Sequence, residues 1–190
     1  MRFFSRVFGS SEFRERLEGA RIRLYRLAYS WCHDAALADD LAQETLIKAL
    51  KKSSQLRDMG AFEGWLFRIL SNCWRDHLRQ RRSTENIDDL DDAEEMPFAS
   101  FSTPEDAHGQ KQLVARVRAA VERLPLGQRQ VLTLIDLEEC SYSETAEILG
   151  IPIGTVMSRI CRARKALKLQ LLERPPLGLV GSGAISRSME

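Results

Sequence analysis

The sequence predicts an all-α protein with two small helical domains, an acidic flexible linker between them and a helix-turn-helix in the second domain. Three observations support this fold class. Apolar residues recur at spacings of three and four along most of the chain, which is typical of amphipathic helices. No run of alternating β-branched residues indicates a strand. Acidic residues are concentrated in one central segment that separates two basic ones.

The first domain, residues 1–82, is expected to contain three helices. The first spans about 13–31, and Asp34 can cap a second that runs to about Lys52. After a break at 57–60, a third helix covers about 62–82. The apolar faces of the three helices are formed by Phe13, Leu17, Leu24, Leu27, Ala28 and Trp31, by Ala38, Leu41, Ala42, Thr45, Leu46 and Ala49, and by Trp65, Leu66, Ile69, Leu70, Cys73 and Leu78.

Residues 83–106 form the linker. They hold nine acidic residues, no basic residue and two prolines, and they show no helical period. The flanking segments are basic, because residues 1–82 hold 16 Lys/Arg against ten Asp/Glu and residues 107–190 hold 12 against eight. The linker is therefore either a solubilising spacer or an anionic strand that lies in a positively charged groove.

The second domain, residues 107–173, is expected to begin with helices at about 104–123 and 126–137. The helix-turn-helix follows them. Residues 174–190 contain little helical pattern and are expected to be disordered.

The helix-turn-helix predicts DNA binding. A short helix over 142–149 ends at Gly150, which suits a left-handed C-cap, and Pro152 prevents fusion with the next helix. That next helix has one apolar stripe at Val156, Ile160, Ala163 and Leu167. Its opposite face could also be an ordinary solvated face, but it carries residue types that bond phosphates and base edges: Thr155, Ser158, Arg159, Arg162 and Lys165.

Two further surfaces lie in the first domain. The outer face of the second helix carries one stripe, which is either solvated or a docking face for a basic helical partner: Asp40, Gln43, Glu44 and Ile47. The third helix carries a basic stripe that could hold a single strand: Asn72, Arg75, Arg79, Gln80, Arg81 and Arg82. Phe62, Trp65 and Phe67 precede this stripe, but Trp65 and Phe67 lie at core spacing. The loop 57–61 is better placed to catch an extruded base.

No metal or other cofactor is expected. Cys32, Cys73, Cys140 and Cys161 form no C-x-x-C pair, so scattered buried thiols in a reducing compartment account for them. No apolar run approaches the roughly 20 residues that span a bilayer, and the N-terminus is too short for a signal-peptide core. A cytoplasmic protein is expected.

Five sequence words resemble those of bacterial RNA polymerase sigma factors of the extracytoplasmic-function (ECF) subfamily. They occur in the family's order over about residues 13–172, with an acidic linker where the family has one. The words are DDLAQET (39–45), FEGWLFRI (62–69), DHLRQRR (76–82), LPLGQRQV (124–131) and GTVMSRICRARK (154–165).

The resemblance implies a role for each surface. The first domain would dock core RNA polymerase through Asp40, Gln43, Glu44 and Ile47. It would recognise and melt the −10 element through Arg57, Asp58, Met59, Phe62, Asn72, Arg75 and Arg79. The second domain would read the −35 duplex through Thr155, Ser158, Arg159, Arg162 and Lys165.

The resemblance also implies partners. These would be core RNA polymerase, promoter DNA and an anti-sigma protein that covers the same faces, with no small-molecule substrate and no enzymatic reaction. The linker would lie in the RNA exit path. Met157 departs from the pattern, because many relatives carry a polar or basic residue there, which predicts a shifted promoter preference.

Two other classes are weaker alternatives. A stand-alone helix-turn-helix regulator would normally bind as a dimer, and no dimerisation heptad or ligand-binding domain is visible. A helical nuclease would need a cluster of metal ligands, which the carboxylates of the second helix do not provide.

Overall fold

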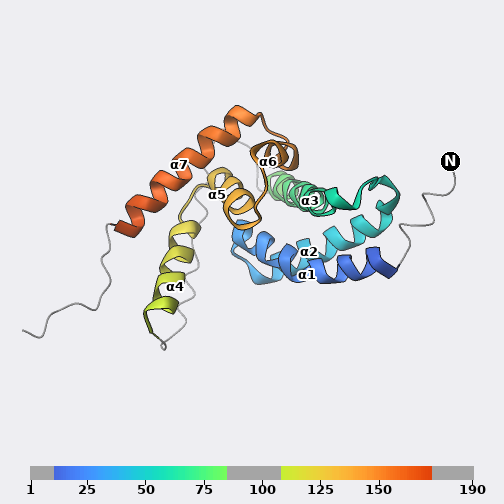
Figure 1. Cartoon of the computed structure of the whole chain (residues 1–190), viewed down its shortest axis with the longest axis horizontal. Coiled ribbons are helices and arrows are strands. Elements are labelled where there is room, and N and C mark those ends of the chain that lie inside the picture. The colour runs from blue at the N-terminus through green and yellow to red at the C-terminus, as the bar shows by residue number, and fades with distance from the viewer. Residues whose placement is uncertain (1–10, 85–107, 173–190) are drawn as a thin grey trace, which may run out of the picture.

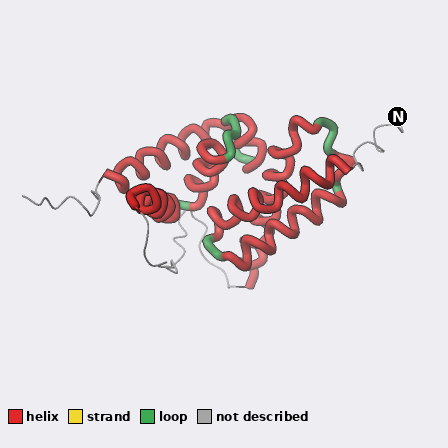
Figure 2. The backbone as a smooth tube through the Cα atoms, turned by 60° about the horizontal axis from the view of Figure 1, so that its bottom comes forward, coloured by secondary structure: helices red, strands yellow, loops and turns green. Residues whose placement is uncertain are grey.

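The computed structural model describes residues 11–84 and 108–172, and in these two ranges the chain forms helices and loops without a strand (Figure 1, Figure 2). The all-α fold with two domains is therefore confirmed. The expected disordered tail and nearly all of the expected linker lie outside the described residues. The first domain contains α1 (Ser11–Cys32), α2 (Ala35–Lys51) and α3 (Phe62–Thr84), and the second contains α4 (His108–Glu122), α5 (Leu126–Leu132), α6 (Tyr142–Leu149) and α7 (Ile153–Leu172).

A tight corner joins α1 and α2 into a hairpin. His33 adopts a positive φ of 54° there. The carboxylate of Asp34 then accepts hydrogen bonds from the backbone N–H groups of Ala36 at 2.9 Å and Leu37 at 3.1 Å. These bonds satisfy N–H groups that the first turn of a helix leaves without partners, so the predicted cap is confirmed.

The predicted break before α3 consists of two short 3₁₀ turns, Ser53–Gln55 and Met59–Ala61. Leu56 lies between them and is buried, which anchors the loop to the domain core. α3 continues to Thr84, two residues beyond the expected boundary.

The single helix predicted over 126–137 is partly wrong. The α-helical part ends at Leu132, and Thr133–Leu137 forms a π-helix. The N–H of Glu138 bonds to the carbonyl of Thr133, five residues earlier, at 3.0 Å. This wider turn ends α5 and leads into the helix-turn-helix.

The helix-turn-helix forms as predicted. Gly150 has φ 65° and ψ 39°, the left-handed conformation that stops α6, and Val156, Ile160 and Ala163 of α7 are buried. Ser141 and Glu144 form a capping box at the start of α6, which the sequence interpretation missed. Leu167, the last residue of the predicted stripe, is only half-buried.

The two domains pack against each other along one junction. α5 and α6 lie beside α1 and α3 (Figure 1), and one apolar core runs through both domains. The indole N–H of buried Trp31 donates to Thr133 Oγ1 at 3.0 Å. Arg23 forms ion pairs with Glu138 of the second domain and, at 2.6 Å, with Glu63 of the first. We call the contacts of Arg23, Trp31, Thr133 and Glu138 the domain junction.

Candidate nucleic-acid and docking surfaces

The predicted stripe on α2 lies on one exposed face. Asp40, Gln43 and Glu44 are exposed, and Ile47 is 51% exposed. Gln43 Nε2 donates to Asp39 at 2.7 Å, and Glu44 pairs with Lys48 at 2.8 Å. Both interactions lie along the helix and leave the stripe accessible from outside.

Leu50 extends this stripe and is 49% exposed. The sequence interpretation missed it, although it lies three residues after Ile47 and therefore on the same face. Two neighbouring exposed aliphatic side chains beside carboxylates suit a partner that is both basic and apolar.

The loop before α3 is held mainly by its own polar groups. Asp58 accepts a hydrogen bond from the N–H of Gly60 at 2.9 Å, so it shapes the turn. The carbonyl of half-buried Met59 accepts a bond from Arg16 Nη1 at 3.2 Å. Arg57 is exposed.

Phe62 requires a correction, because direct contact with a base does not fit its position. Only 2% of it is exposed. Its ring meets Phe13 edge-on at 5.8 Å between centroids, and the Arg16 guanidinium lies 4.8 Å from its centroid. Phe62 therefore packs in the core next to the loop and stabilises the loop from that side.

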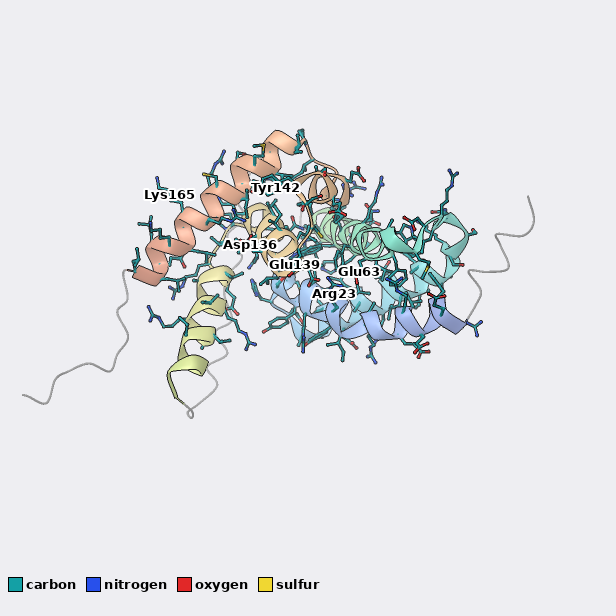
Figure 3. All side chains as sticks on the ribbon, in the orientation of Figure 1. Arg23, Glu63, Asp136, Glu139, Tyr142 and Lys165 are labelled. Carbon is teal, nitrogen blue, oxygen red and sulfur yellow. The ribbon has the colours of Figure 1, made fainter. Side chains whose placement is uncertain are left out.

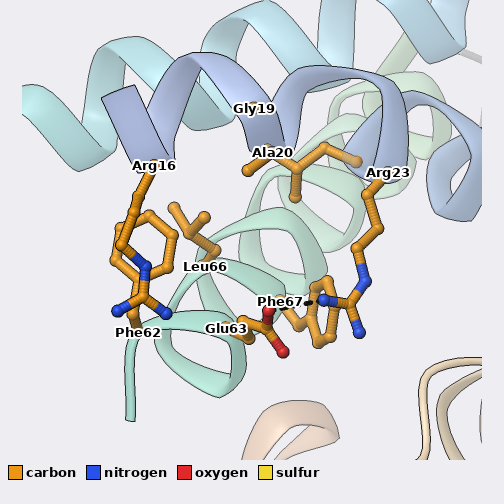
Figure 4. A pocket seen from close by; sticks show the side chains of 9 residues that line it. Arg16, Gly19, Ala20, Arg23, Phe62, Glu63, Leu66 and Phe67 are labelled. Carbon is orange, nitrogen blue, oxygen red and sulfur yellow. Dashed lines mark ion pairs between the residues drawn. The ribbon is translucent and has the colours of Figure 1, made fainter. Parts of the chain in front are cut away.

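A small cleft of about 140 Å³ lies between α1 and α3. Figure 4 shows Arg16 and Arg23 reaching from α1 toward Phe62 and Phe67 of α3, with Glu63 paired to Arg23. The Arg23 guanidinium lies 5.2 Å from the Phe67 centroid. The sequence interpretation missed both arginines, although their spacing of seven places them on one face of α1.

The basic stripe of α3 is divided between solvent and the second domain. Asn72 is exposed and accepts a hydrogen bond from Arg75. Arg75 also lies beside Gly150, where an added Cβ would be 3.2 Å from Arg75 Nη1. Arg79 is 76% exposed in its side chain and lies 3.7 Å from Asp76.

Helix α7 exposes only part of the predicted set of residues. Arg162 and Lys165 are exposed as expected, and Figure 3 shows Lys165 on the outer side of α7. Thr155 and Ser158 are half-buried, and Ser158 Oγ donates to the Thr155 carbonyl at 3.0 Å. Arg159 folds back over α5. Its guanidinium carbon lies so close to Gly127 that a Cβ added to this glycine would be only 2.9 Å from it.

The outward face of α7 includes residues that the sequence interpretation left out. Ile153 and Met157 are 50% and 54% exposed, and Cys161 is exposed. The sequence could have indicated this face, because the three residues are spaced four apart and residues four apart lie on the same side of a helix.

The groups with the largest pKa shifts lie near the domain junction. Burial and the neighbouring Arg129 charge lower the pKa of His33 to about 4. Burial lowers the pKa of Arg129 to about 10, and its Nη1 donates to the Glu122 carbonyl at 3.0 Å. Burial and then nearby glutamates raise the pKa of the Cys140 thiol to about 11.

Neither a metal-binding cluster nor a membrane-spanning helix occurs among residues 11–84 and 108–172. No group of three or more His, Cys, Asp or Glu is arranged to hold a metal ion in that part of the chain. The helices described there are also too short or too polar to cross a bilayer.

Comparisons with known proteins identify the family. The Sigma-70 region 2 family matches residues 18–84, and the Sigma-70 region 4 family matches residues 115–167. The ECF RNA polymerase sigma factor SigW of Bacillus subtilis is 32% identical over 155 residues, which cover 78% of this chain and 83% of SigW. The chain belongs to the ECF sigma factors.

Other relatives agree with this membership. The RNA polymerase sigma-H factor of Pseudomonas aeruginosa is 36% identical over 151 residues, covering 76% of this chain and 78% of that protein. The ECF sigma factor SigE of Mycolicibacterium smegmatis is 38% identical over 146 residues. That match covers 77% of this chain but only 56% of SigE.

Two solved structures are similar to this ECF chain. The sigma factor RpoE of Bartonella quintana, in complex with the anti-sigma factor NepR, has a TM-score of 0.64 at 28% identity. The match covers 86% of this chain and 98% of RpoE. CnrH, in complex with the cytosolic domain of CnrY, has a TM-score of 0.57 at 25% identity, covering 90% of this chain and 91% of CnrH.

Proposed function

We propose that this ECF sigma factor binds core RNA polymerase and directs promoter-specific transcription initiation. In this proposal α7 reads the −35 element as duplex, and α3 with its preceding loop reads the −10 element as a melted strand. The observation that carries it is the presence of two basic helical faces in the two matched sigma regions. These faces include Arg75 and Arg79 on α3 and Arg162 and Lys165 on α7.

The proposed roles follow the domain boundaries expected from the sequence. Residues 1–82 dock polymerase through the α2 stripe and act at the −10 element, and residues 107–173 act at the −35 element. The acidic segment 83–106 lies in the RNA exit path, where its nine carboxylates match a groove built for nucleic acid. Residues 174–190 form a tail without an assigned contact.

The proposed mechanism needs no covalent chemistry and takes place in the cytoplasm with polymerase. Each domain alone binds duplex weakly and with strong salt dependence. Docking on polymerase makes the second contact intramolecular, so two modest contacts give one tight readout. Capture of an extruded base offsets a few kcal/mol of unstacking during melting.

Reading both elements at once requires the domains to separate. Elements about 25 base pairs apart are centred roughly 85 Å apart along B-DNA. In the described structure α3 and α6 are in contact. The 23 residues between α3 and α4 can span up to about 80 Å when extended, so the chain length permits separation.

An anti-sigma protein is the proposed regulator. Both similar solved structures are complexes, one of the sigma factor RpoE with the anti-sigma factor NepR and one of CnrH with the cytosolic domain of CnrY. The exposed α2 stripe and the outward face of α7 are the surfaces that such a partner would cover.

The test is in vitro transcription with bacterial core RNA polymerase and fragmented genomic DNA, with and without this chain. New transcript starts that share two upstream elements at fixed spacing support the proposal. A Glu44→Lys variant is expected to lose activity on all promoters, whereas an Arg162→Ala variant is expected to weaken binding to the −35 element without abolishing initiation. Absence of new starts, together with tight operator binding by the chain alone, would instead support a stand-alone regulator.

A further inference from the structure

The outward face of α7 carries an apolar ridge, which consists of Ile153, Met157 and Cys161. Half or more of Ile153 and Met157 is exposed, and Cys161 is the exposed member of the four cysteines. A spacing of four places the three side chains on one face over the first three turns of α7. These turns contact base edges when a helix-turn-helix enters the major groove.

The charged residues leave the centre of this ridge open. Arg159 turns away from it and lies over Gly127, and Arg164 forms a bidentate pair with Asp136 at 2.6 and 3.2 Å. Arg162 and Lys165 remain exposed beyond the ridge, where they suit phosphates. An apolar ridge with basic residues beside it is better suited to bind a DNA groove than to bind a basic surface of another protein.

The ridge also contrasts with the other apolar side of α7. Val156, Ile160 and Ala163 fill the domain core and are at most 3% exposed. Met157 contributes little to that core, so the folded domain alone does not account for an apolar side chain at this position.

We propose that Met157 reads the C5-methyl group of a thymine in the −35 duplex, with Ile153 beside it as a second apolar contact. This inference rests on the proposed function. The thymine methyl is the apolar feature that the major groove offers for distinguishing base pairs. Methionine is unbranched and polarizable, so it can adapt its side chain to a methyl group in the groove.

The test removes that methyl group alone. A duplex −35 element obtained from the mapped promoters is made with deoxyuridine in place of each thymine in turn. Binding of holoenzyme to each duplex is then measured by competition. Burial of one methyl group predicts about a fourfold weaker affinity at the contacted thymine and little change elsewhere.

Two variants of matched size separate methyl recognition from general binding. Met157→Gln keeps the length of the side chain but presents an amide, so it is expected to bind the thymine and deoxyuridine duplexes equally. Met157→Leu keeps an apolar tip and is expected to retain most of the discrimination. Circular dichroism of both variants checks that their helices are intact.

The outcomes are distinguishable from failure of the proposed function. If the wild type initiates at promoters but tolerates deoxyuridine at every position, the thymine assignment is wrong and the sigma-factor function stands. The assignment would also be wrong if replacing thymine by deoxyuridine weakened the binding of wild type and of Met157→Gln equally. If the chain does not support initiation at all, the proposed function itself fails.

Cys161 provides a second readout of the ridge. Promoter DNA in the holoenzyme is expected to slow alkylation of Cys161 by N-ethylmaleimide several-fold, as followed by peptide mass spectrometry. Cys32, Cys73 and Cys140 are less exposed and serve as internal controls. Unchanged labelling of Cys161 on the bound promoter would place the ridge outside the groove and contradict the proposal.

Discussion

The two candidate DNA-reading surfaces differ in how much of each the other described residues cover. On α3, Arg75 lies beside Gly150 of the helix-turn-helix and is bonded to Asn72. On α7, Met157, Arg162 and Lys165 face outward. One domain's turn thus occupies part of the other domain's basic face, whereas the recognition helix stays open.

The two surfaces therefore depend differently on how the two domains are arranged. The open face of α7 can contact duplex DNA without rearrangement of the domains. The face of α3 depends on the domain junction, because the covering turn moves only when the second domain moves. Stability of the junction is therefore expected to affect the α3 surface far more than the α7 surface.

The largest expected effect comes from the buried hydrogen bond of the junction. Trp31→Ala removes a side chain that is 1% exposed, and we expect the free energy of unfolding to fall by about 3–5 kcal/mol. Thr133→Val removes the hydroxyl of the second domain that accepts this hydrogen bond. It leaves the indole N–H of Trp31 buried without its partner. It is expected to cost about 1–3 kcal/mol. Urea unfolding followed by circular dichroism measures both, and an unchanged midpoint for Thr133→Val would contradict the role of the bond.

The ion pairs of Arg23 give the next effect. Glu138→Arg brings two guanidinium groups together at a site where Glu138 is 11% exposed and Arg23 is 37% exposed. Since Arg23 is partly screened by solvent, a loss of about 2 kcal/mol is expected, with opening of the domains. Small-angle X-ray scattering should show a larger radius of gyration. Glu147→Arg, at an exposed position of α6, is the control, and equal expansion in both variants would argue against the Arg23 contact.

The fold was largely predictable because its signals are local. The Asp34 cap, the Gly150 corner and the buried stripe of α7 each depend on residues within one or two turns. The π-helix at Thr133–Leu137 was missed because apolar spacing does not distinguish a π turn from an α turn within one helical segment. The contact of Thr133 with Trp31, more than 100 residues away in the sequence, could not be predicted from local pattern either.

The candidate surfaces were predictable only as helix faces. Helical spacing correctly grouped Asp40, Gln43, Glu44 and Ile47, whose side chains need no distant partner. It could not show that Phe62 packs on Phe13, or that Arg159 lies over Gly127. The positions of the Phe62 and Arg159 side chains depend on residues of other helices. Residue type alone therefore gave the wrong expectation for them.

His33 offers a pH-dependent change in the junction. The pKa of His33 is lowered from 6.5 to about 4 by burial and by Arg129 of α5, while the Tyr29 ring of the preceding helix α1 contacts it edge-on at 6.2 Å between centroids. Below pH 6.5 the unfolded chain binds a proton that the folded chain excludes until about pH 4. Stability is therefore present above pH 6.5 and declines as pH falls toward 4. After allowance for solvent screening, a loss on the order of 1–2 kcal/mol is expected.

The control for this effect must keep the local backbone. His33→Asn tolerates the positive φ of 54° at this corner and cannot titrate. Urea unfolding of wild type and His33→Asn from pH 7 to pH 4 should show a steeper decline for the wild type. Parallel curves would mean that other groups account for the pH dependence.

The smallest effect tests the open and covered surfaces directly through salt dependence. Arg162→Ala and Lys165→Ala each remove an exposed charge, so each is expected to reduce the slope of log affinity against log salt by about 1 for duplex DNA. For the isolated chain, Arg75→Ala is expected to leave this slope unchanged, because Arg75 lies against the turn at Gly150. In the holoenzyme, where the proposed function requires separated domains, the same Arg75→Ala variant should lower the slope on promoter DNA. A reduced slope for Arg75→Ala in the isolated chain would show that the α3 surface is already open, and the contrast between the two surfaces would then not hold in solution.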